Sequence, residues 1–433
     1  MQSSNQGQKK ICIVGGGASG LATAYFLEND YEVTLFERRQ RLGGHAHTNY
    51  FEHEGHIIPV EIGCEFFSRK AFPTFLQLLK ILGIATRPCP VNYTFYNAVT
   101  NRAVCVPPFR KEGVVWDTLL PGNLINLIQM GYAVHSSRKV IAARDTALTM
   151  EQFIDRLWVT DRFKKEFFFP FLAAGWGANP VDFRKFACYN ILSWSYVHRM
   201  QGLKPYIWEE IVDGVSGYIN RIASLSSKTT RYLGTTVERV ERTGDGYTLH
   251  SSDGRATYCD YLVIATSAYD SQKLLRGVPG MEQVQEKLSK IEYLTAHIAL
   301  HSDVSVLHPD PKKWSVVNVK YDGSCSRLTV YKRNLGTLPV FRSWVDPQVF
   351  VPKNAYIIEP FYHAKPTSAY FAGQKAVKES QGKQNIWFGG LYTHDLDSHE
   401  SAIVAALKTG QKLAPQAERV RQLQLSTEPL LPG

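Results

Sequence analysis

The chain has 433 residues, of which 44% are hydrophobic, 20% charged and 12% aromatic. This length suggests two or three domains of about 150 residues each, and the composition excludes disordered, collagen-like and coiled-coil proteins. The net charge of +10 favours an anionic partner, which could be a phosphate cofactor, a membrane face or nucleic acid.

The start of the chain and its cysteines bear on where the protein works. The first ten residues are polar and end in two lysines, which predicts no signal peptide. The apolar run from Ile11 to Leu27 holds four glycines and is expected to form strand, turn and helix rather than a membrane span. Seven scattered cysteines without a CxxC pair favour reduced thiols in a cytoplasmic chain, and neither a disulfide framework nor a zinc site.

The first elements form a compact pattern. Residues 10–14 are a continuously apolar run typical of a strand buried on both faces. Residues 19–28 have helical character and residues 32–37 read as a second strand, which together predict a βαβ unit. A further helix is predicted over 72–82, and residues 100–225 are predicted to be mostly helical.

The second half of the chain is predicted to be richer in strands. Turn signals at 244–246 and 252–254 separate three short strands, and a β-rich stretch covers roughly 293–362. The closing helix presents one apolar face. In chain order, the remaining elements predicted are strands at 235–240, 246–250, 256–258, 261–265 and 386–388 and a helix from about His399.

A glycine motif follows the first strand and opens the first helix. In Gly15-x-Gly17-x-x-Gly20, the first glycine permits a tight turn, the second lets backbone approach a pyrophosphate, and the third packs helix on strand. The helix N-terminus then faces the phosphates, and Glu37 at the end of the next strand accepts the ribose hydroxyls. The motif predicts dinucleotide binding, and the acid favours FAD or NAD over NADP.

A second glycine pair favours FAD over NAD. Arg41-Leu42-Gly43-Gly44 adds another close backbone approach near the phosphates, with arginines alongside. The sequence contains no second GxGxxG motif, so no separate nicotinamide module is predicted.

These motifs resemble the glutathione-reductase-type FAD domain of flavin amine oxidases, phytoene desaturases and protoporphyrinogen oxidase. Residues 236–240 match the strand whose valine, here Val237, contacts adenine, and residues 261–266 match the next parallel strand. Gly389-Gly390 and residues 399–402 match the segment that places a helix N-terminus at the flavin pyrimidine oxygen, where a helix dipole stabilises the reduced ring. The resemblance implies that a side chain at Gly390 would occupy the ring's own volume, whereas the apoprotein would tolerate it.

A narrower resemblance covers residues 41–48, 208–219, 301–303 and 361–363. These stretches are similar to a branch of flavoproteins close to the oxidase-like N-terminal domain of plant cyclopropane fatty-acid synthases. The resemblance implies redox chemistry on a lipid acyl chain. The chain departs from this branch at Glu61-Ile62-Gly63-Cys64, where the branch usually has Asp-x-Gly-Phe.

The fold expected is α/β, with a Rossmann-like FAD-binding domain of the glutathione-reductase type and an interleaved α+β substrate domain. Residues 8–75, 215–285 and 378–420 are assigned to the FAD-binding domain, and residues 76–214 and 286–377 to the substrate domain. The residues expected to bind FAD are Gly15, Gly17, Ala18, Ser19, Gly20, Glu37, Arg38, Arg41, Gly43, Gly44, His45, Glu61, Gly63, Val237, Thr266, Gly389, Gly390, Leu391, His399 and Ala402.

Two histidines are expected to act in catalysis. His363 and His399 lie in segments that lead to the flavin, and imidazole titrates near neutral pH. A hydrogen-bonded structural role is the alternative for His363, and the family's contact at the position of His399 is largely backbone. Four more histidines lie between residues 45 and 56, where packing of the cofactor loop is favoured over a metal site, so no metal is predicted.

The activity expected is hydride transfer to flavin N5 from a C–H bond, either alpha to nitrogen in an amine or on a lipid acyl chain. The alternatives are a flavin-dependent isomerase and a flavin-bearing structural or effector protein without turnover. Dispersed lysines and arginines predict no nucleic-acid binding. A weakly basic face for an anionic membrane fits a lipid substrate, although an ordinary solvated surface explains the charge equally well. The sequence carries no signal for the oligomeric state.

Overall fold

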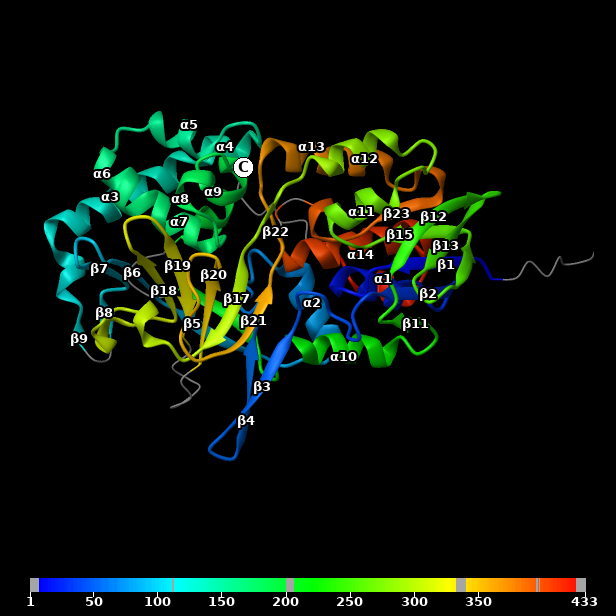
Figure 1. Ribbon diagram of the computed structural model, residues 1–433, viewed down its shortest axis with the longest axis horizontal. Helices are drawn as coiled ribbons and strands as arrows, with labels where there is room; N and C mark the ends of the chain where they lie inside the picture. The colour runs from blue at the N-terminus through cyan, green and yellow to red at the C-terminus, as the bar shows by residue number, and fades with distance from the viewer. Residues whose placement is uncertain are drawn as a thin grey trace, which may run out of the picture.

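The computed structural model describes residues 8–110, 113–199, 206–331, 340–394, 396 and 398–425. Figure 1 shows two sheets side by side along the long axis of the molecule, each with helices packed against it. One sheet is parallel and the other mostly antiparallel, and each combines strands from distant parts of the chain.

The first sheet is five-stranded, and all its strand pairs are parallel. Alternate side chains of its central strand enter two different cores, with Ile11 and Ile13 on one face and Cys12 and Val14 on the other. This explains the continuously apolar run, because a strand covered on both faces has no solvent side. In spatial order the strands are β11 (Thr230–Leu233), β2 (Glu32–Glu37), β1 (Lys10–Val14), β15 (Tyr261–Ile264) and β23 (Ile386–Phe388).

Helices and a small antiparallel sheet cover the two faces of this parallel sheet. The core containing Ile11 includes residues of α1 (Ala18–Leu27), α2 (Pro73–Ile81), α10 (Val215–Leu225) and α14 (His399–Leu413). The opposite core includes residues of the elements β12 (Val237–Thr243), β13 (Gly246–Ser251), β14 (Ala256–Cys259), α11 (Ala268–Leu274), α12 (Glu282–Ser289) and α13 (Ser368–Ser380).

The second sheet is seven-stranded and antiparallel except for one parallel pair, β18 with β6. Its strands come from two distant regions of the chain, residues 93–106 and 297–360. In spatial order they are β21 (Ala355–Pro360), β17 (His297–His301), β20 (Phe341–Val345), β19 (Ser326–Val330), β18 (Val317–Tyr321), β6 (Tyr93–Asn97) and β7 (Arg102–Val106).

A helical segment packs against the second sheet through a phenylalanine-rich core. Phe167 contacts both Phe95 of β6 and Phe163, with ring centroids 5.0 and 6.0 Å away. The helices of this segment are η1 (Trp116–Leu119), α3 (Pro121–Ser136), α4 (Arg138–Ala142), α5 (Met150–Asp155), α6 (Asp161–Phe163), the π-helix η2 (Lys164–Phe168), α7 (Phe169–Gly175), α8 (Pro180–Phe183) and α9 (Cys188–Val197).

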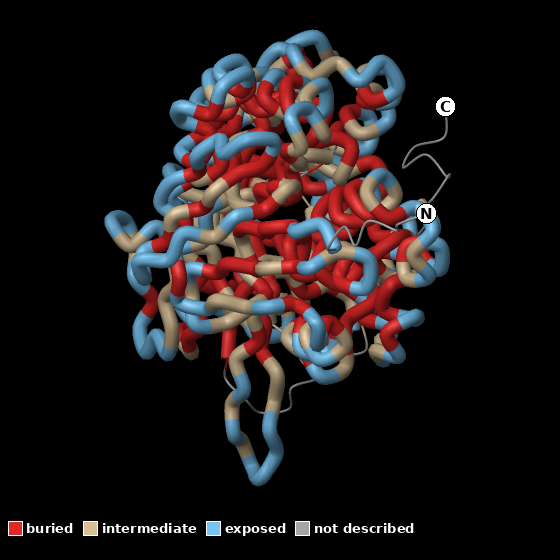
Figure 2. Tube along the Cα trace, turned by 90° about the vertical axis from the view of Figure 1, so that its right-hand side faces the viewer, coloured by how far each residue is buried: buried red, intermediate tan, exposed pale blue. Residues whose placement is uncertain are grey.

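Shorter elements complete the described chain. The hairpin of β3 (Thr48–His53) and β4 (His56–Glu61) projects from the body of the molecule, and Figure 2 shows that most of it is exposed or half-buried. The others are β5 (Thr86–Val91) paired with β10 (Tyr206–Ile211), β8 (Phe109–Arg110) with β9 (Gly113–Val114), β16 (Tyr293–Leu294) with β22 (His363–Ala364), η3 (Val304–Val306), η4 (Pro311–Lys313), η6 (Lys383–Asn385), η7 (Leu391–Thr393) and α15 (Glu418–Gln422).

The predicted elements match the structure where the pattern is local. The predicted strands at 32–37 and 386–388 and the start of the last helix at His399 are confirmed. The prediction of mostly helix over 100–225 was wrong near both ends, because residues 102–106 form a strand of the seven-stranded sheet and residues 206–211 form strand β10. The boundaries between the FAD-binding and substrate domains stay a prediction.

Candidate flavin-binding site

The turn between β1 and α1 is tight because its glycines pack against backbone. Gly15 has φ +107°, and its N–H donates to the carbonyl of Phe36 at 2.8 Å. A Cβ on Gly15 would lie 2.6 Å from the Ala265 oxygen, and one on Gly20 would lie 1.9 Å from the Gly15 oxygen. The turn and the packing of helix on strand therefore both require glycine.

Gly17 is less constrained by its surroundings than Gly15 and Gly20, the other two glycines of the motif. It has φ −68°, and the nearest atom to a Cβ built there is the Cα of Gly44, 3.9 Å away. Gly17 also forms a β-bridge with Gly43, whose N–H donates to the Gly16 carbonyl at 2.8 Å. The structure thus brings Gly17 and the Gly43-Gly44 pair together at the start of α1. The protein leaves space for a Cβ at Gly17.

The first turn of α1 offers backbone donors. Its N-cap is Gly17, which has no side chain to accept from them, and the turn contains no acidic residue. Ala18 and Ser19 are buried. Uncapped N–H groups and the positive end of the helix dipole favour an anion here, so this turn fits the pyrophosphate of a dinucleotide.

The carboxylate of Glu37 is buried next to the glycine turn. One oxygen accepts from the N–H of Gly16 at 2.7 Å and the other from the N–H of Arg39 at 2.8 Å. Each carboxylate oxygen has a further acceptor position, so the group can stabilise the turn and still accept ribose hydroxyls. The N–H of Thr235 donates to the Glu37 carbonyl at 2.9 Å, which brings the start of the Val237 strand next to Glu37.

The two predicted arginines differ in their contacts. Arg41 donates to the carbonyl of Gly44 at 3.0 Å and supports the second glycine pair. Arg38 instead pairs with Asp270 of α11 at 3.2 Å, and its side chain is 53% exposed. Of these two, only Arg41 contacts the second glycine pair, and Arg39 also donates to the Gly44 carbonyl at 3.4 Å.

Glu61 supports neighbouring elements. Its carboxylate accepts from the N–H of Val215, the first residue of α10, at 3.0 Å and from the hydroxyl of Thr48 at 2.9 Å. Gly63 packs directly on the cofactor loop, since a Cβ there would lie 2.1 Å from the His45 oxygen. Glu61 therefore caps α10, and Gly63 allows the backbone of residue 45 to come close.

His45 follows the second glycine pair and is enclosed by protein. Its ring stacks on Phe361, with centroids 4.1 Å apart and an interplanar angle of 24°. Burial is the largest cause that lowers its pKa to about 3, with smaller contributions in the same direction from nearby groups that include His363 and Arg39. The imidazole is therefore neutral at ordinary pH.

An aromatic and ion-paired cluster joins this loop to the second sheet; of its residues the sequence predicted a role for His363 but not for Arg342 or Glu65. The Trp344 ring lies 5.1 Å from the Phe361 ring and 6.2 Å from the His363 ring. Arg342 pairs with Glu65 at 3.2 Å and also donates to the carbonyl of Gly63. The sequence signals for this cluster were the resemblance over residues 361–363 and the imidazole of His363, and neither pointed to the ion pair.

The closing segment reaches the first glycine turn from the other end of the chain. The N–H of Gly389 donates to the Ile264 carbonyl at 2.8 Å, and the N–H of Gly390 donates to the Ser19 hydroxyl at 3.1 Å. Gly390 has φ +105°, and a Cβ there would lie 2.8 Å from the Thr266 oxygen. The expectation that apoprotein tolerates a side chain at Gly390 was wrong, because the clash is with the chain's own backbone. Leu391 begins the short helix η7 directly afterwards.

His399 is the first residue of α14 and lies in an aromatic cage. Its Nε2 is hydrogen-bonded to the Tyr218 hydroxyl, and its ring packs 4.7 Å from Phe75 and 5.8 Å from Phe67. Burial lowers its pKa to about 4. These contacts favour a packing role for the imidazole over proton transfer. Ala402, one turn further, is buried in the core shared with α1.

Glu400 links the same helix to α2. Its carboxylate accepts from the N–H groups of Thr74 and Phe75 at 2.9 and 2.8 Å, which caps the start of α2. Burial raises the pKa of Glu400. The α14 N-terminus is itself capped by the Ser398 hydroxyl, which accepts from the N–H of Ser401. Two helix starts are therefore fixed together at the closing segment.

Metal-ligand clusters and membrane-spanning helices are both absent from the described residues. No three His, Cys, Asp or Glu side chains among them gather in a way that could hold a metal ion. No helix within the described ranges combines the length and apolarity needed to cross a membrane.

The site and fold agree with comparisons to known proteins. Residues 18–318 match the model of the flavin-containing amine oxidoreductase family. The chain is 15% identical to cyclohexylamine oxidase from Brevibacterium oxydans IH-35A, with a TM-score of 0.70, over 95% of this chain and 100% of that one. It also superposes on putrescine oxidase bound to putrescine, with a TM-score of 0.64 at 14% identity over 94% and 98% of the two chains.

The matches to relatives found by sequence span a smaller share of each relative's own length. Beta-cyclopiazonate dehydrogenase of Aspergillus flavus is 24% identical over 72% of this chain and 65% of its own, which is just under two thirds. Coproporphyrinogen III oxidase of Mycobacterium tuberculosis is 41% identical over 83 residues, 18% of this chain and 17% of its own.

Because the family model matches well over half of its length, the chain belongs to the flavin-containing amine oxidoreductase family. The expected α/β fold of an FAD-binding domain with a substrate domain is confirmed. FAD is the cofactor that this family uses, and the glycine turn, the uncapped start of α1 and Glu37 fit it.

Proposed function

We propose that the protein is an FAD-dependent oxidoreductase that oxidises a C–H bond of an amine or of a lipid acyl chain. The observation that carries this proposal is the meeting of three glycine segments at the start of α1. Gly17 bridges Gly43, and the N–H of Gly390 donates to Ser19 in the first turn of that helix. Family membership supports the same function.

Each part of this site has a role in holding the cofactor. The backbone N–H groups of Ala18, Ser19 and Gly20 would bind the pyrophosphate, and Glu37 would accept the ribose hydroxyls. Arg41 holds the Gly44 carbonyl and so fixes the loop that closes over this turn. When bound, FAD supplies the hydride acceptor.

The cluster of Arg342, Glu65, Trp344, Phe361 and His363 is proposed to face the substrate. The Arg342 guanidinium is already paired with a carboxylate, so a second carboxylate from a substrate would gain little there. The aromatic rings favour apolar groups and amines. We therefore propose an amine with an apolar substituent ahead of a free carboxylic acid.

His363 remains the proposed proton carrier. It lies in β22, with its ring among Trp344 and Phe361, whereas the His399 ring is held by Tyr218. A proton carrier gives a pH-dependent rate of flavin reduction that disappears in His363→Gln. A profile unchanged in that variant would contradict the role.

Anaerobic mixing tests the function directly. The FAD-loaded protein is mixed with a panel of cyclic amines, linear diamines and unsaturated fatty acids, and the yellow absorbance is followed. Bleaching by an amine or an acyl compound, with recovery after air is admitted, supports the proposal. Substrate conversion only after chemical pre-reduction identifies an isomerase, a competing outcome because a CLA-producing fatty acid isomerase from P. acnes shares the fold at a TM-score of 0.65.

A small-molecule substrate is consistent with the family. The lipid substrate, weak association with an anionic membrane and cytoplasmic location all stay proposals. The first is tested by the acyl compounds in the panel above.

A further inference from the structure

Helix α3 has its apolar and polar faces reversed relative to an ordinary surface helix. A surface helix normally turns apolar side chains to the core and charged ones to water. In α3, Asn123 and Gln129 are among the buried residues, at 3% and 9% exposure, whereas Ile128 is 71% exposed. The outward side chains are therefore the ones that water disfavours.

The exposed side of α3 is continuous. At 100° per residue its exposed positions fall within an arc of about 120°, and His135 at the end is the only polar residue among them. No Asp, Glu, Lys or Arg occurs between Pro121 and Ser136. The exposed residues of the helix are Pro121, Leu124, Ile125, Ile128, Gly131, Tyr132 and His135.

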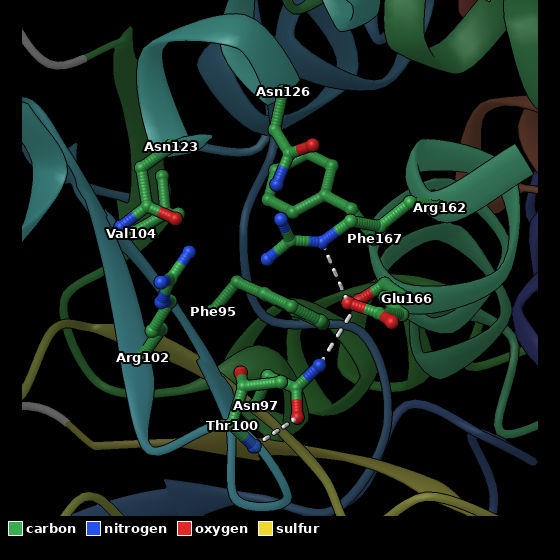
Figure 3. Close-up of a pocket in the computed structure, with 10 residues that line it drawn as sticks. All are labelled: Phe95, Asn97, Thr100, Arg102, Val104, Asn123, Asn126, Arg162, Glu166 and Phe167. Carbon is green, nitrogen blue, oxygen red and sulfur yellow. Dashed lines mark hydrogen bonds and ion pairs between the residues drawn. The ribbon is translucent and has the colours of Figure 1, made fainter. Parts of the chain in front are cut away.

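The inner side of α3 is partly polar. Figure 3 shows Asn123 and Asn126 reaching toward Arg102 and Arg162 beneath the helix. The cavity between them measures about 20 Å³, which is room for about one water molecule and too little for a substrate. The buried Asn123 amide has partners on this side, because it donates to the carbonyls of Ala103 at 3.1 Å and Asp117 at 2.7 Å. The apolar surface has no partner within the described chain.

A tryptophan and a leucine lie next to this surface in the chain. Trp116 is 71% exposed and Leu120 is 47% exposed, just before the helix begins. We call Trp116, Leu120 and the exposed residues of the helix the outer face of α3.

Positive charge borders the outer face. The exposed Arg138 and Lys139 directly follow the end of the helix. Asp117, next to Trp116 in the chain, has a cationic partner, since it pairs with Lys313 at 2.5 Å.

We propose that the outer face of α3 is a membrane-binding surface that lies flat on a bilayer containing anionic phospholipid. Amphipathic helices of this kind bury their apolar side at the boundary between headgroups and acyl chains. Tryptophan and tyrosine are the residues enriched at that depth. Lysine and arginine at the rim gain from the negative surface potential.

Charge favours lipid over a second copy of the chain. A symmetric dimer through this face would bring the basic rims of two copies together, and like charges across an interface oppose association. An anionic bilayer meets the same rim with opposite charge. The surface is separate from the flavin site, because α3 lies at the opposite end of the molecule from α1 and β1 (Figure 1). The proposal assigns to this face the weak association with an anionic membrane proposed above, and it does not depend on the oxidase activity.

Vesicle flotation with the FAD-loaded full chain tests the proposal. Wild-type protein is expected to float with phosphatidylcholine vesicles that contain phosphatidylglycerol and much less with phosphatidylcholine alone. Ile128→Asp is expected to lower the partition coefficient about tenfold or more, because burial of an isoleucine side chain is lost. Removing Arg138 and Lys139 as glutamines is expected to lower it about fivefold per charge.

A matched control lies at the tip of the projecting hairpin. Ile57 is 74% exposed, against 71% for Ile128, and Ile57→Asp is expected to float as wild type does. Retained flavin colour in all variants shows that they are folded. The proposal is overturned if wild type fails to float, or if Ile57→Asp and Ile128→Asp lose binding equally. It is also overturned if light scattering finds a dimer that Ile128→Asp separates.

Discussion

Gly17 offers a substitution that distinguishes the needs of the cofactor from the needs of the fold. Of the three motif glycines, Gly15 and Gly20 are blocked by backbone oxygens at 2.6 and 1.9 Å, whereas Gly17 has φ −68° and no atom nearer than 3.9 Å. The protein itself therefore accommodates Gly17→Ala. A methyl group there would lie 3.9 Å from the Cα of Gly44, in the space beside the first turn of α1 where the pyrophosphate is proposed to bind.

Gly17→Ala is expected to change the stability of the apoprotein little and the affinity for FAD strongly. Alanine is a poorer N-cap than glycine by about 0.5–1 kcal/mol, and it stabilises by about 0.4–1 kcal/mol through the lower freedom of the unfolded chain. The free energy of unfolding of apoprotein should thus change by about 0.5 kcal/mol or less. Loss of one or two hydrogen bonds to a charged phosphate costs about 1.5–3 kcal/mol each, so the Kd for FAD should rise about a hundredfold.

The assay compares urea unfolding of apoprotein with FAD titration followed by flavin fluorescence. Gly175→Ala serves as the control, because Gly175 lies in α7 with nothing within 4 Å of its Cβ position and φ outside the left-handed region. Wild-type FAD affinity in Gly17→Ala would refute the placement of the pyrophosphate. A loss of apoprotein stability as large as that of Gly20→Ala would refute the claim that the protein has room for a methyl group at Gly17.

Three further predictions follow from the same contacts. Glu37→Ala should weaken FAD binding by about 1.5–3 kcal/mol. It should also lower apoprotein stability in urea by about 2 kcal/mol, because two backbone N–H groups lose their acceptor. Unchanged FAD affinity would exclude the ribose contact. His399→Ala should retain FAD through the backbone of α14 yet lose about 2–4 kcal/mol of stability from the cavity left beside Tyr218, and loss of FAD at unchanged stability would contradict this. Acidification should unfold the protein, because four buried or half-buried imidazoles have pKa values lowered to about 3 or 4, against about 6.5 in the unfolded chain. Their neutral forms stabilise the fold fully above pH 6.5, and each should lose about 2 kcal/mol of that stability by about pH 5. Urea unfolding at a series of pH values measures this, and a flat profile from about pH 7 to 5 would contradict it. The four residues are His45, His198, His301 and His399.

The sequence predicted the parts of the fold whose patterns are local. The run at 10–14, the glycine motif and the closing strand and helix are each recognisable within a few residues. Strand β5 was missed because Pro88 and Pro90 interrupt its pattern, and proline usually argues against a strand. It forms because it pairs only with β10, in a two-stranded sheet.

The site was predictable in its glycines but less so in its polar groups. The role of Gly15 and Gly20 follows from the motif, and backbone oxygens confirm the need for glycine at both. The partner of Glu61 could not be read from the sequence, because Val215 is brought to it only by the fold. The restriction at Gly390 likewise depends on Thr266, which is distant in the chain.

The capping of α2 by Glu400 has a consequence for how the protein is made. The acceptor for the N–H groups of Thr74 and Phe75 lies more than three hundred residues later in the chain, and strand β23, which completes the parallel sheet beside β15, is translated similarly long after α2. The nascent chain therefore holds an unfinished sheet edge and an uncapped helix until these pieces emerge from the ribosome. Such distant pairings are slow to form. Cofactor loading is therefore expected to wait until β23 and α14 have been made and can meet the glycine turn.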